Sequence, residues 1–353
     1  MVLNERFNWN LISRFRSEIM GVAIVFVLIC HSDSFSWGGA QAFVKQIMPV
    51  FAIGVDIFLF VSGVGLYFSM RKNSNIYYFY KKRFLRIIPE FLIVSAASCA
   101  LITTLRKNDF VWSEFLIKVS GIRAAVLKNS GENGAVWYVI FIIIMYAFYP
   151  ALFSLEKLSE KQRRIAYGII MALPIATELL LAAFVPDVFK KYEIDRMLMR
   201  IPIFAFGAYM GRVVNTGGEC RRVLVPILFA AFLIVRALKI FLLGDSPLGM
   251  PIVKIANQCL AIGLMLFAAL FLESLKEDRL RLFRSMLSWC GKASLELYLI
   301  HSFLIHIYFA LHLPKQWPLY LVVVLPLSFA LSALVLAVKK IIGLKIQGRR
   351  ANI

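Results

Sequence analysis

Acidic residues, cysteines and long polar segments are scarce in this sequence. Only 17% of the 353 residues are charged, and Asp and Glu number 20 against 40 Lys and Arg. The five cysteines are scattered and form no CxxC pair: Cys30, Cys99, Cys220, Cys259 and Cys290. That pattern indicates neither a disulfide framework nor a metal site, so no metal is expected. Because no polar segment is long enough to fold by itself, we predict a single domain over residues 1–353.

Long hydrophobic runs fill most of the chain. Hydrophobic residues make up 60% of it and the mean hydropathy is +0.77, whereas an ordinary soluble domain is about 45–50% apolar. A spanning helix needs about 20 mostly apolar residues. The sequence therefore predicts an all-α, polytopic integral membrane protein with about ten transmembrane helices. The predicted spans are residues 19–36, 47–69, 87–105, 135–155, 165–185, 199–214, 223–243, 252–272, 287–310 and 319–338.

The net charge of +20 is the second constraint on function. In a soluble protein such a charge would suggest nucleic acid, but in a membrane protein basic residues gather in the cytoplasmic loops and set the topology. Lys and Arg of alternate loops divide 25 to 10 between the two sides. We therefore expect a multi-pass protein of the cell (inner) membrane with both termini in the cytoplasm, membrane lipids as partners and no nucleic acid.

The first two spans carry ionisable residues, which are costly inside a membrane and call for an explanation. His31, in the run CHSDSFSW, lies about 18–20 Å from the inner edge, in the outer half of the bilayer. Its imidazole can take a proton from a hydroxyl, and Asp33 or Asp56 can orient the ring as a carboxylate does in a catalytic dyad. The structural alternatives are a histidine bonded to backbone or water at a helix end and, for Asp56, the favourable helix dipole.

Two further segments combine polar residues with a span. The small residues of GVDIFLFVSG, residues 54–63, usually serve close helix packing, and we expect packing there. In GKASLELYLIH, residues 291–301, Lys292 and Glu296 are spaced for a pair within one helix. His301 lies beyond them in mid-span, where a buried structural histidine is the alternative to a functional one.

A basic loop lies between the second and third spans. In RKNSNIYYFYKKRFLRIIP, residues 71–89, the side chains of Lys82, Arg83 and Arg86 come directly before an apolar run. Arg83 and Arg86 are three residues apart and share one face of a helix, so together they can hold the phosphates of a cytoplasmic nucleotide-like donor. The alternative is a purely topological role with attraction to anionic lipids.

The order of these segments resembles the membrane acyltransferase-3 family, the O-acyltransferases that modify bacterial surface polysaccharides, peptidoglycan and some antibiotics. The resemblance covers nearly the whole chain. It rests on EIMGVAIVFVLICH, GVDIFLFVSGVGLYF, YKKRFLRIIPEF, WYVIFIIIMYAFYP and GKASLELYLIH, in that order.

The resemblance implies a cytoplasmic acyl-coenzyme A donor, acetyl-coenzyme A in the first instance, and an extracytoplasmic acceptor hydroxyl. His31 matches the histidine that is catalytic in the family, and Arg83 and Arg86 match its basic RxxR-type motif for the coenzyme A phosphates. The second-span signature and the late YLxH-like signature are matched by Asp56, Ser62, Gly63, Tyr298 and His301.

One position departs from the family pattern. The family has an arginine eleven residues before the histidine, where this chain has Met20. Arg16 lies four residues earlier on roughly the same helix face, and its long side chain can extend toward the same place. The expected donor-binding residues are therefore Arg83, Arg86, Lys82 and Arg16.

These observations favour transfer of an acyl group to a hydroxyl of a cell-surface glycan. His31 acts as general base with Asp33 or Asp56 orienting it, or a side chain carries the acyl group covalently. Substrate-binding or structural roles in the membrane fall to Ser62, Glu296, Tyr298 and His301. The alternatives are a transporter or flippase for a glycan or small polar solute, and a catalytically silent partner subunit. The acceptor, oligomeric state and other cell-envelope biosynthesis proteins as partners stay open.

Overall fold

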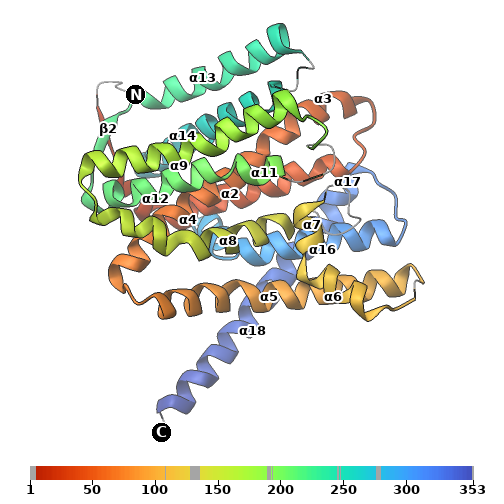
Figure 1. Cartoon of the computed structure of the whole chain (residues 1–353). Helices are drawn as coiled ribbons and strands as arrows, with labels where there is room; N and C mark the ends of the chain where they lie inside the picture. Colours follow the sequence, from red (N-terminus) through yellow and green to blue (C-terminus); the bar gives the residue numbers. More distant parts are fainter. Residues whose placement is uncertain are drawn as a thin grey trace.

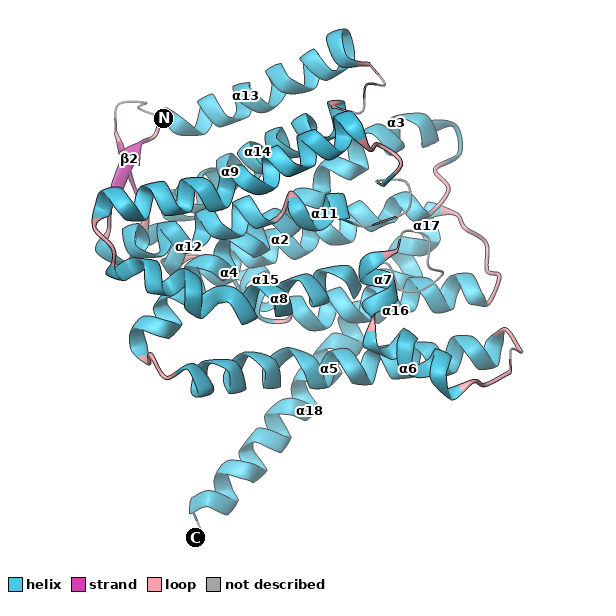
Figure 2. Ribbon diagram, in the orientation of Figure 1, coloured by secondary structure: helices cyan, strands magenta, loops and turns pink. Residues whose placement is uncertain are grey.

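The computed structural model describes residues 5–107, 109–127, 136–188, 192, 194–244, 246, 248–275 and 280–351, without the side chains of 124 and 342–351. Nearly all of these residues are helical, which confirms the all-α prediction (Figure 2). The helices are α1 (Asn10–Arg14), α2 (Arg16–Cys30), α3 (Gln41–Ile47), α4 (Ile53–Lys72), α5 (Ile76–Leu105), α6 (Trp112–Ser120), α7 (Ile122–Val126), α8 (Val136–Ser154), α9 (Glu160–Phe184), α11 (Ile194–Leu198), α12 (Ile201–Thr216), α13 (Leu224–Leu238), α14 (Gly249–Ser274), α15 (Arg281–Lys292), α16 (Ser294–Ala310), α17 (Trp317–Leu319) and α18 (Leu325–Ala351). One antiparallel pair of short strands, β1 (Arg6–Asn8) and β2 (Glu219–Arg221), joins the start of the chain to the turn after α12.

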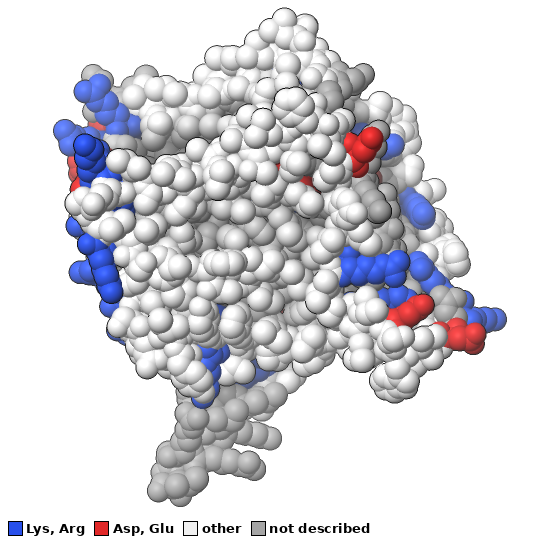
Figure 3. Space-filling model, viewed as in Figure 1, with Lys and Arg blue, Asp and Glu red and all other residues white. Residues whose placement is uncertain are grey.

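The number of spans agrees with the prediction. In the described residues nine helical stretches are long and apolar enough to cross a membrane, and the count reaches ten when the bent pair α15 and α16 is taken as one span. The chain is a multi-pass membrane protein. Lys, Arg, Asp and Glu gather toward the two ends of the helices, and most of the surface between those ends is uncharged on the face that Figure 3 presents.

The helices are arranged around α2 and α4 (Figure 1). α13 lies along one edge of the bundle beside α14, and α5 and α6 lie along the opposite edge. α18 leaves the bundle obliquely toward the C-terminus. The central position of α2 and α4 means that His31, at the end of α2, and Asp56, in the first turn of α4, are surrounded by protein on most sides.

The ninth predicted span, residues 287–310, is broken. α15 and α16 meet at an angle of 72°, at Ala293, because α15 packs tightly across α2. A Cβ added at Gly291 would lie 2.9 Å from the backbone nitrogen of Gly21, so only glycine permits this approach. The bend also explains why the predicted pair of Lys292 with Glu296 is wrong: the two residues stand on different helices, and Glu296 pairs instead with Lys339 of α18, Nζ to Oε1 2.7 Å.

Small residues bring α4 and α12 together, as the sequence predicted for residues 54–63. A Cβ at Gly63 would lie 2.6 Å from the backbone nitrogen of Ala208. In a membrane, where lipid is as apolar as the helices, such close backbone approach is a main source of helix association. The packing prediction for this face is confirmed, and it fixes the lateral position of Asp56 and Ser62 on α4.

Candidate active site

Two histidines from opposite ends of the chain form the centre of the site. His31 follows the last residue of α2, and His301 lies in the middle of α16 and is fully buried. The Nδ1 atom of His31 and the Nε2 atom of His301 are 2.7 Å apart, a hydrogen-bond distance. The bend before α16 turns this helix so that His301 meets the end of α2.

The backbone around His301 decides which nitrogen carries which proton. Nδ1 of His301 lies 2.8 Å from the carbonyl oxygen of Leu297, one turn earlier in α16. A carbonyl only accepts, so this nitrogen carries the proton, and Nε2 of the neutral ring is the acceptor. It follows that His31 donates from Nδ1 to His301. The Nε2 atom of His31 then holds a free lone pair, which is what a general base for a hydroxyl requires.

The two carboxylates predicted to orient His31 lie elsewhere in the structure. Asp56 is fully buried and forms an ion pair with Arg200 at the start of α12. Asp33 accepts a hydrogen bond from the hydroxyl of Ser34, 3.4 Å away. Within the described residues neither carboxylate hydrogen-bonds to His31, and the position expected for a carboxylate is taken by His301. Arg200, the partner of Asp56, is itself partly buried, with 16% of its side chain exposed.

A cavity of about 710 Å³, counted with its open side, approaches this histidine pair. It lies between α2, α4, α5, α8 and α16. Its wall includes Met20, where this chain departs from the family pattern, and five of the expected donor-binding or in-membrane residues: Arg16, Arg83, Arg86, Ser62 and Tyr298.

The wall residues follow one another along the helices from the arginines toward the histidines. Arg16 lies at the start of α2, about 22 Å of helical rise before His31, and Arg83 lies early in α5. Tyr298 lies one turn before His301, with ring centroids 6.2 Å apart, and its ring also contacts Tyr138 of α8 at 5.2 Å. The cavity thus extends from a group of arginines to the aromatic rings beside the histidines.

In the part of the chain that the structure describes, no carboxylate neutralises the arginines of the cavity. Among the described residues no Asp or Glu forms an ion pair with Arg16, Arg83 or Arg86, and the buried Nε atoms of Arg16 and Arg83 have no hydrogen-bond partner. A buried donor without a partner is costly. Two such donors on cations at one wall are therefore suited to hold an anion.

Arg16 lines the same cavity as Met20, the position where the family pattern has an arginine. Its guanidinium lies against Gly65 of α4, where a Cβ would be 2.9 Å from Nη2. A side chain at position 65 would displace the guanidinium. The absence of a side chain at Gly65 gives Arg16 room to reach the cavity that Met20 also lines.

Besides His301, two of the expected donor-binding or in-membrane residues lie outside the cavity wall, Lys82 and Glu296. Lys82 is exposed on α5 and does not line the cavity. Glu296 is buried and paired with Lys339, which also pairs with Glu90 of α5. That cluster joins α5, α16 and α18. Tyr138 and Tyr146, which line the cavity from α8, were not singled out in the sequence, although the segment WYVIFIIIMYAFYP contains both.

Comparison with known proteins gives one match. The model of the acyltransferase-3 family, described as an acyltransferase domain, matches residues 21–337 of the 353. The matched segment contains both histidines and the pair Arg83 and Arg86, and it begins just after Arg16 and Met20. No match is found among curated proteins or among solved structures.

Proposed function

Because the chain belongs to the acyltransferase-3 family and is a membrane acyltransferase, we propose that it transfers an acetyl group from cytoplasmic acetyl-coenzyme A to a hydroxyl of an extracytoplasmic cell-surface glycan. The family assignment sets aside the transporter or flippase considered from the sequence. The observation that carries the proposal is the single cavity that leads from three unneutralised arginines to a tyrosine in contact with the histidine pair.

The donor enters from the basic side. Arg16, Arg83 and Arg86 hold the phosphates of coenzyme A, and the pantetheine arm follows the largely apolar wall toward Tyr298. The excess of basic residues on the side of Arg83 and Arg86 supports a cytoplasmic position for this entrance and for both termini.

The transfer step needs one base and no further cofactor. His31 Nε2 takes the proton from the acceptor hydroxyl as its oxygen attacks the thioester carbonyl. The carbon–sulfur bond then breaks, and the coenzyme A thiolate leaves with the proton that His31 received. His301 accepts the hydrogen bond from His31 Nδ1 throughout and keeps the ring in the required tautomer.

The first test concerns the donor. Purified protein in lipid nanodiscs is titrated with acetyl-coenzyme A, and we expect saturable binding that Arg83→Ala with Arg86→Ala weakens by about a hundred-fold or more, because two charged hydrogen-bond donors are lost. The matched control removes two exposed positive charges from another loop, Lys157→Ala with Lys161→Ala, and should bind as the wild type does. No saturable binding by folded wild-type protein would contradict the donor assignment.

A second prediction concerns Arg16. Changing Arg16→Met should weaken acetyl-coenzyme A binding by about ten- to hundred-fold, since one charged donor is lost. Adding Met20→Arg to that variant should recover most of the affinity, because positions 16 and 20 line the same cavity. Wild-type affinity in the single variant would show that Arg16 does not contact the donor.

A further inference from the structure

A second cavity lies beside the first, where α4, α8 and α12 end. It contains about 600 Å³ of empty space, counted with its open side, and is lined by Tyr67, Arg71, Phe153, Glu156, Arg212 and Asn215, among others. Pockets for small ligands contain roughly 300–1,000 Å³. The family resemblance and the transfer step described above make no use of it.

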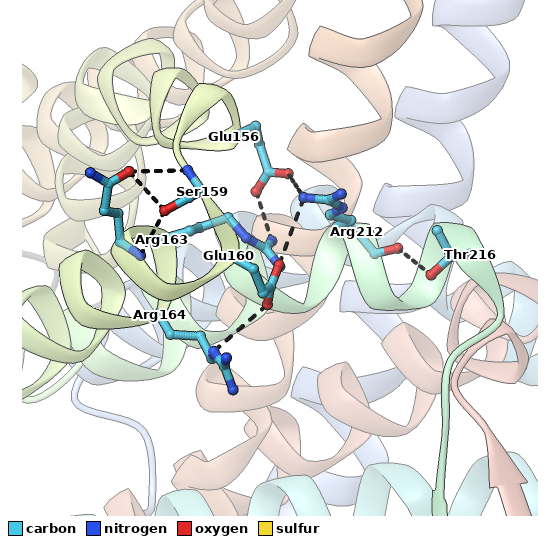
Figure 4. Close-up of polar contacts among 8 residues, drawn as sticks. Glu156, Ser159, Glu160, Arg163, Arg164, Arg212 and Thr216 are labelled. Atoms are coloured by element: carbon cyan, nitrogen blue, oxygen red, sulfur yellow. Dashed lines mark hydrogen bonds and ion pairs between the residues drawn. The ribbon is translucent and has the colours of Figure 1, made fainter.

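The charges around this cavity favour an anion. Arg163, whose side chain is 3% exposed, donates to Glu156 at 3.0 Å and to Glu160 at 2.8 Å, and so neutralises the one carboxylate of the wall (Figure 4). Arg212 approaches the same two glutamates only at 4.0 and 3.8 Å, which is too far for hydrogen bonds. Arg212 therefore forms ion pairs with both glutamates through Nη1 but no hydrogen bonds with them, and its N–H groups can donate to a ligand.

Arg71 adds a second available cation. It is exposed at the last turn of α4, and within the described part of the chain it has no carboxylate partner. With Glu156 held by Arg163, the two arginines give the cavity an excess of positive charge. Arginine side chains hydrogen-bond phosphate oxygens at two points, so a phosphate monoester, with three terminal oxygens, suits a cavity with two arginines.

The uncharged part of the wall suits a planar heterocycle. The rings of Tyr67 and Phe153 meet with centroids 5.9 Å apart and an interplanar angle of 60°, so they offer an aromatic corner. Asn215 is exposed on α12, and its amide can donate and accept at once, as adenine recognition requires. A phosphate site next to an aromatic corner and an amide corresponds to an adenosine phosphate.

The two cavities share two helices. On α4, Leu66 lines the first cavity and the adjacent Tyr67 lines the second. On α8, Tyr146 lines the first and Phe153 the second, seven residues or about 10 Å further along the axis. In coenzyme A the pyrophosphate lies between adenosine and pantetheine, so one molecule can place its pantetheine in the first cavity and its nucleoside in the second.

We propose that the second cavity binds the adenosine end of the donor, with Arg71 and Arg212 on the ribose phosphate monoester. This inference rests on the proposed coenzyme A donor. It makes the cavity a selectivity site that distinguishes coenzyme A from carriers that present the same thioester arm without this phosphate.

The test compares coenzyme A with dephospho-coenzyme A, which lacks only that phosphate, by calorimetry on the full chain in nanodiscs. The wild type should bind coenzyme A about ten- to hundred-fold more tightly. Arg71→Ala and Arg212→Gln should each reduce this preference and together remove it, with little effect on dephospho-coenzyme A. Arg221→Ala, an exposed arginine of β2 that lines neither cavity, should keep the full preference.

The outcomes separate this inference from the function on which it rests. Equal wild-type affinity for both ligands, or a preference that survives in the double variant, contradicts the adenosine site in the second cavity. Coenzyme A then remains the proposed donor. Wild-type protein that binds neither ligand overturns both. Arg71→Ala keeps the test decisive if Arg212→Gln disturbs the glutamate network, because Arg71 has no partner to lose within the described residues.

Discussion

Replacing His31 by alanine is expected to lower the rate of acyl transfer by about 10²–10⁴-fold, the usual contribution of a positioned general base. The reason is the free lone pair on Nε2, which exists because Nδ1 donates to His301 at 2.7 Å. Arg16, one of the arginines proposed to hold the donor, lies about 22 Å away along α2, and His31 does not line the donor cavity, so acetyl-coenzyme A should bind to the variant with unchanged affinity. The measurement is base-labile acetate on envelope carbohydrate of cells that express equal amounts of folded protein.

A second histidine serves as the control for His31→Ala, because it tests whether the loss of any imidazole on that side of the membrane lowers acetylation. His312 is exposed in the loop after α16 and has a φ of 54°, so asparagine, which tolerates this conformation, is the suitable replacement. His312→Asn should keep wild-type acetylation. If His31→Ala also kept it, with donor binding intact, His31 would not be the base.

The sequence predicted the spans well because the bilayer imposes a length and a composition that a hydropathy pattern reveals directly. It also indicated His31, Arg83 and Arg86, since ionisable residues in or beside a span are costly and therefore few. The close packing of α4 on α12 followed from small residues at helical spacing. Each of these predictions depends on residues that are near one another in the chain.

What the sequence did not predict depends on contacts between distant residues. Asp56 meets Arg200 across 144 positions, and His31 meets His301 across 270. The sequence therefore favoured a carboxylate close to His31 in the chain as the partner of this histidine. In the structure the partner of His31 is His301 instead. The bend at Ala293 has the same origin, because it follows from the packing of α15 on α2 and no proline or glycine stands at the break itself.

His301 gives the second large effect we expect. With His301→Leu, the ring of His31 loses its side-chain acceptor and keeps only the backbone carbonyl of Val27. The imidazole can then carry its proton on Nε2, where it cannot act as a base. Loss of a group that fixes a tautomer lowers activity by about ten- to hundred-fold or more, and we expect at least a hundred-fold decrease in kcat. Because His301 does not line the donor cavity, the KM for acetyl-coenzyme A should not change. Thiol release in nanodiscs supplied with envelope glycan extract measures both.

Two further variants distinguish a positioning role of His301 from a structural one. His301→Gln restores a side-chain oxygen near the place of Nε2, which can accept from His31, so it should recover much of the kcat lost in the leucine variant. His306 also bonds the carbonyl one turn earlier, from Nδ1 to Ser302 at 2.9 Å. His306→Leu therefore removes the same helix contact without removing the acceptor of His31, and its kcat should fall much less than that of His301→Leu. Equal losses in His301→Leu and His301→Gln would mean that His301 serves packing, and the tautomer of His31 would then need another cause.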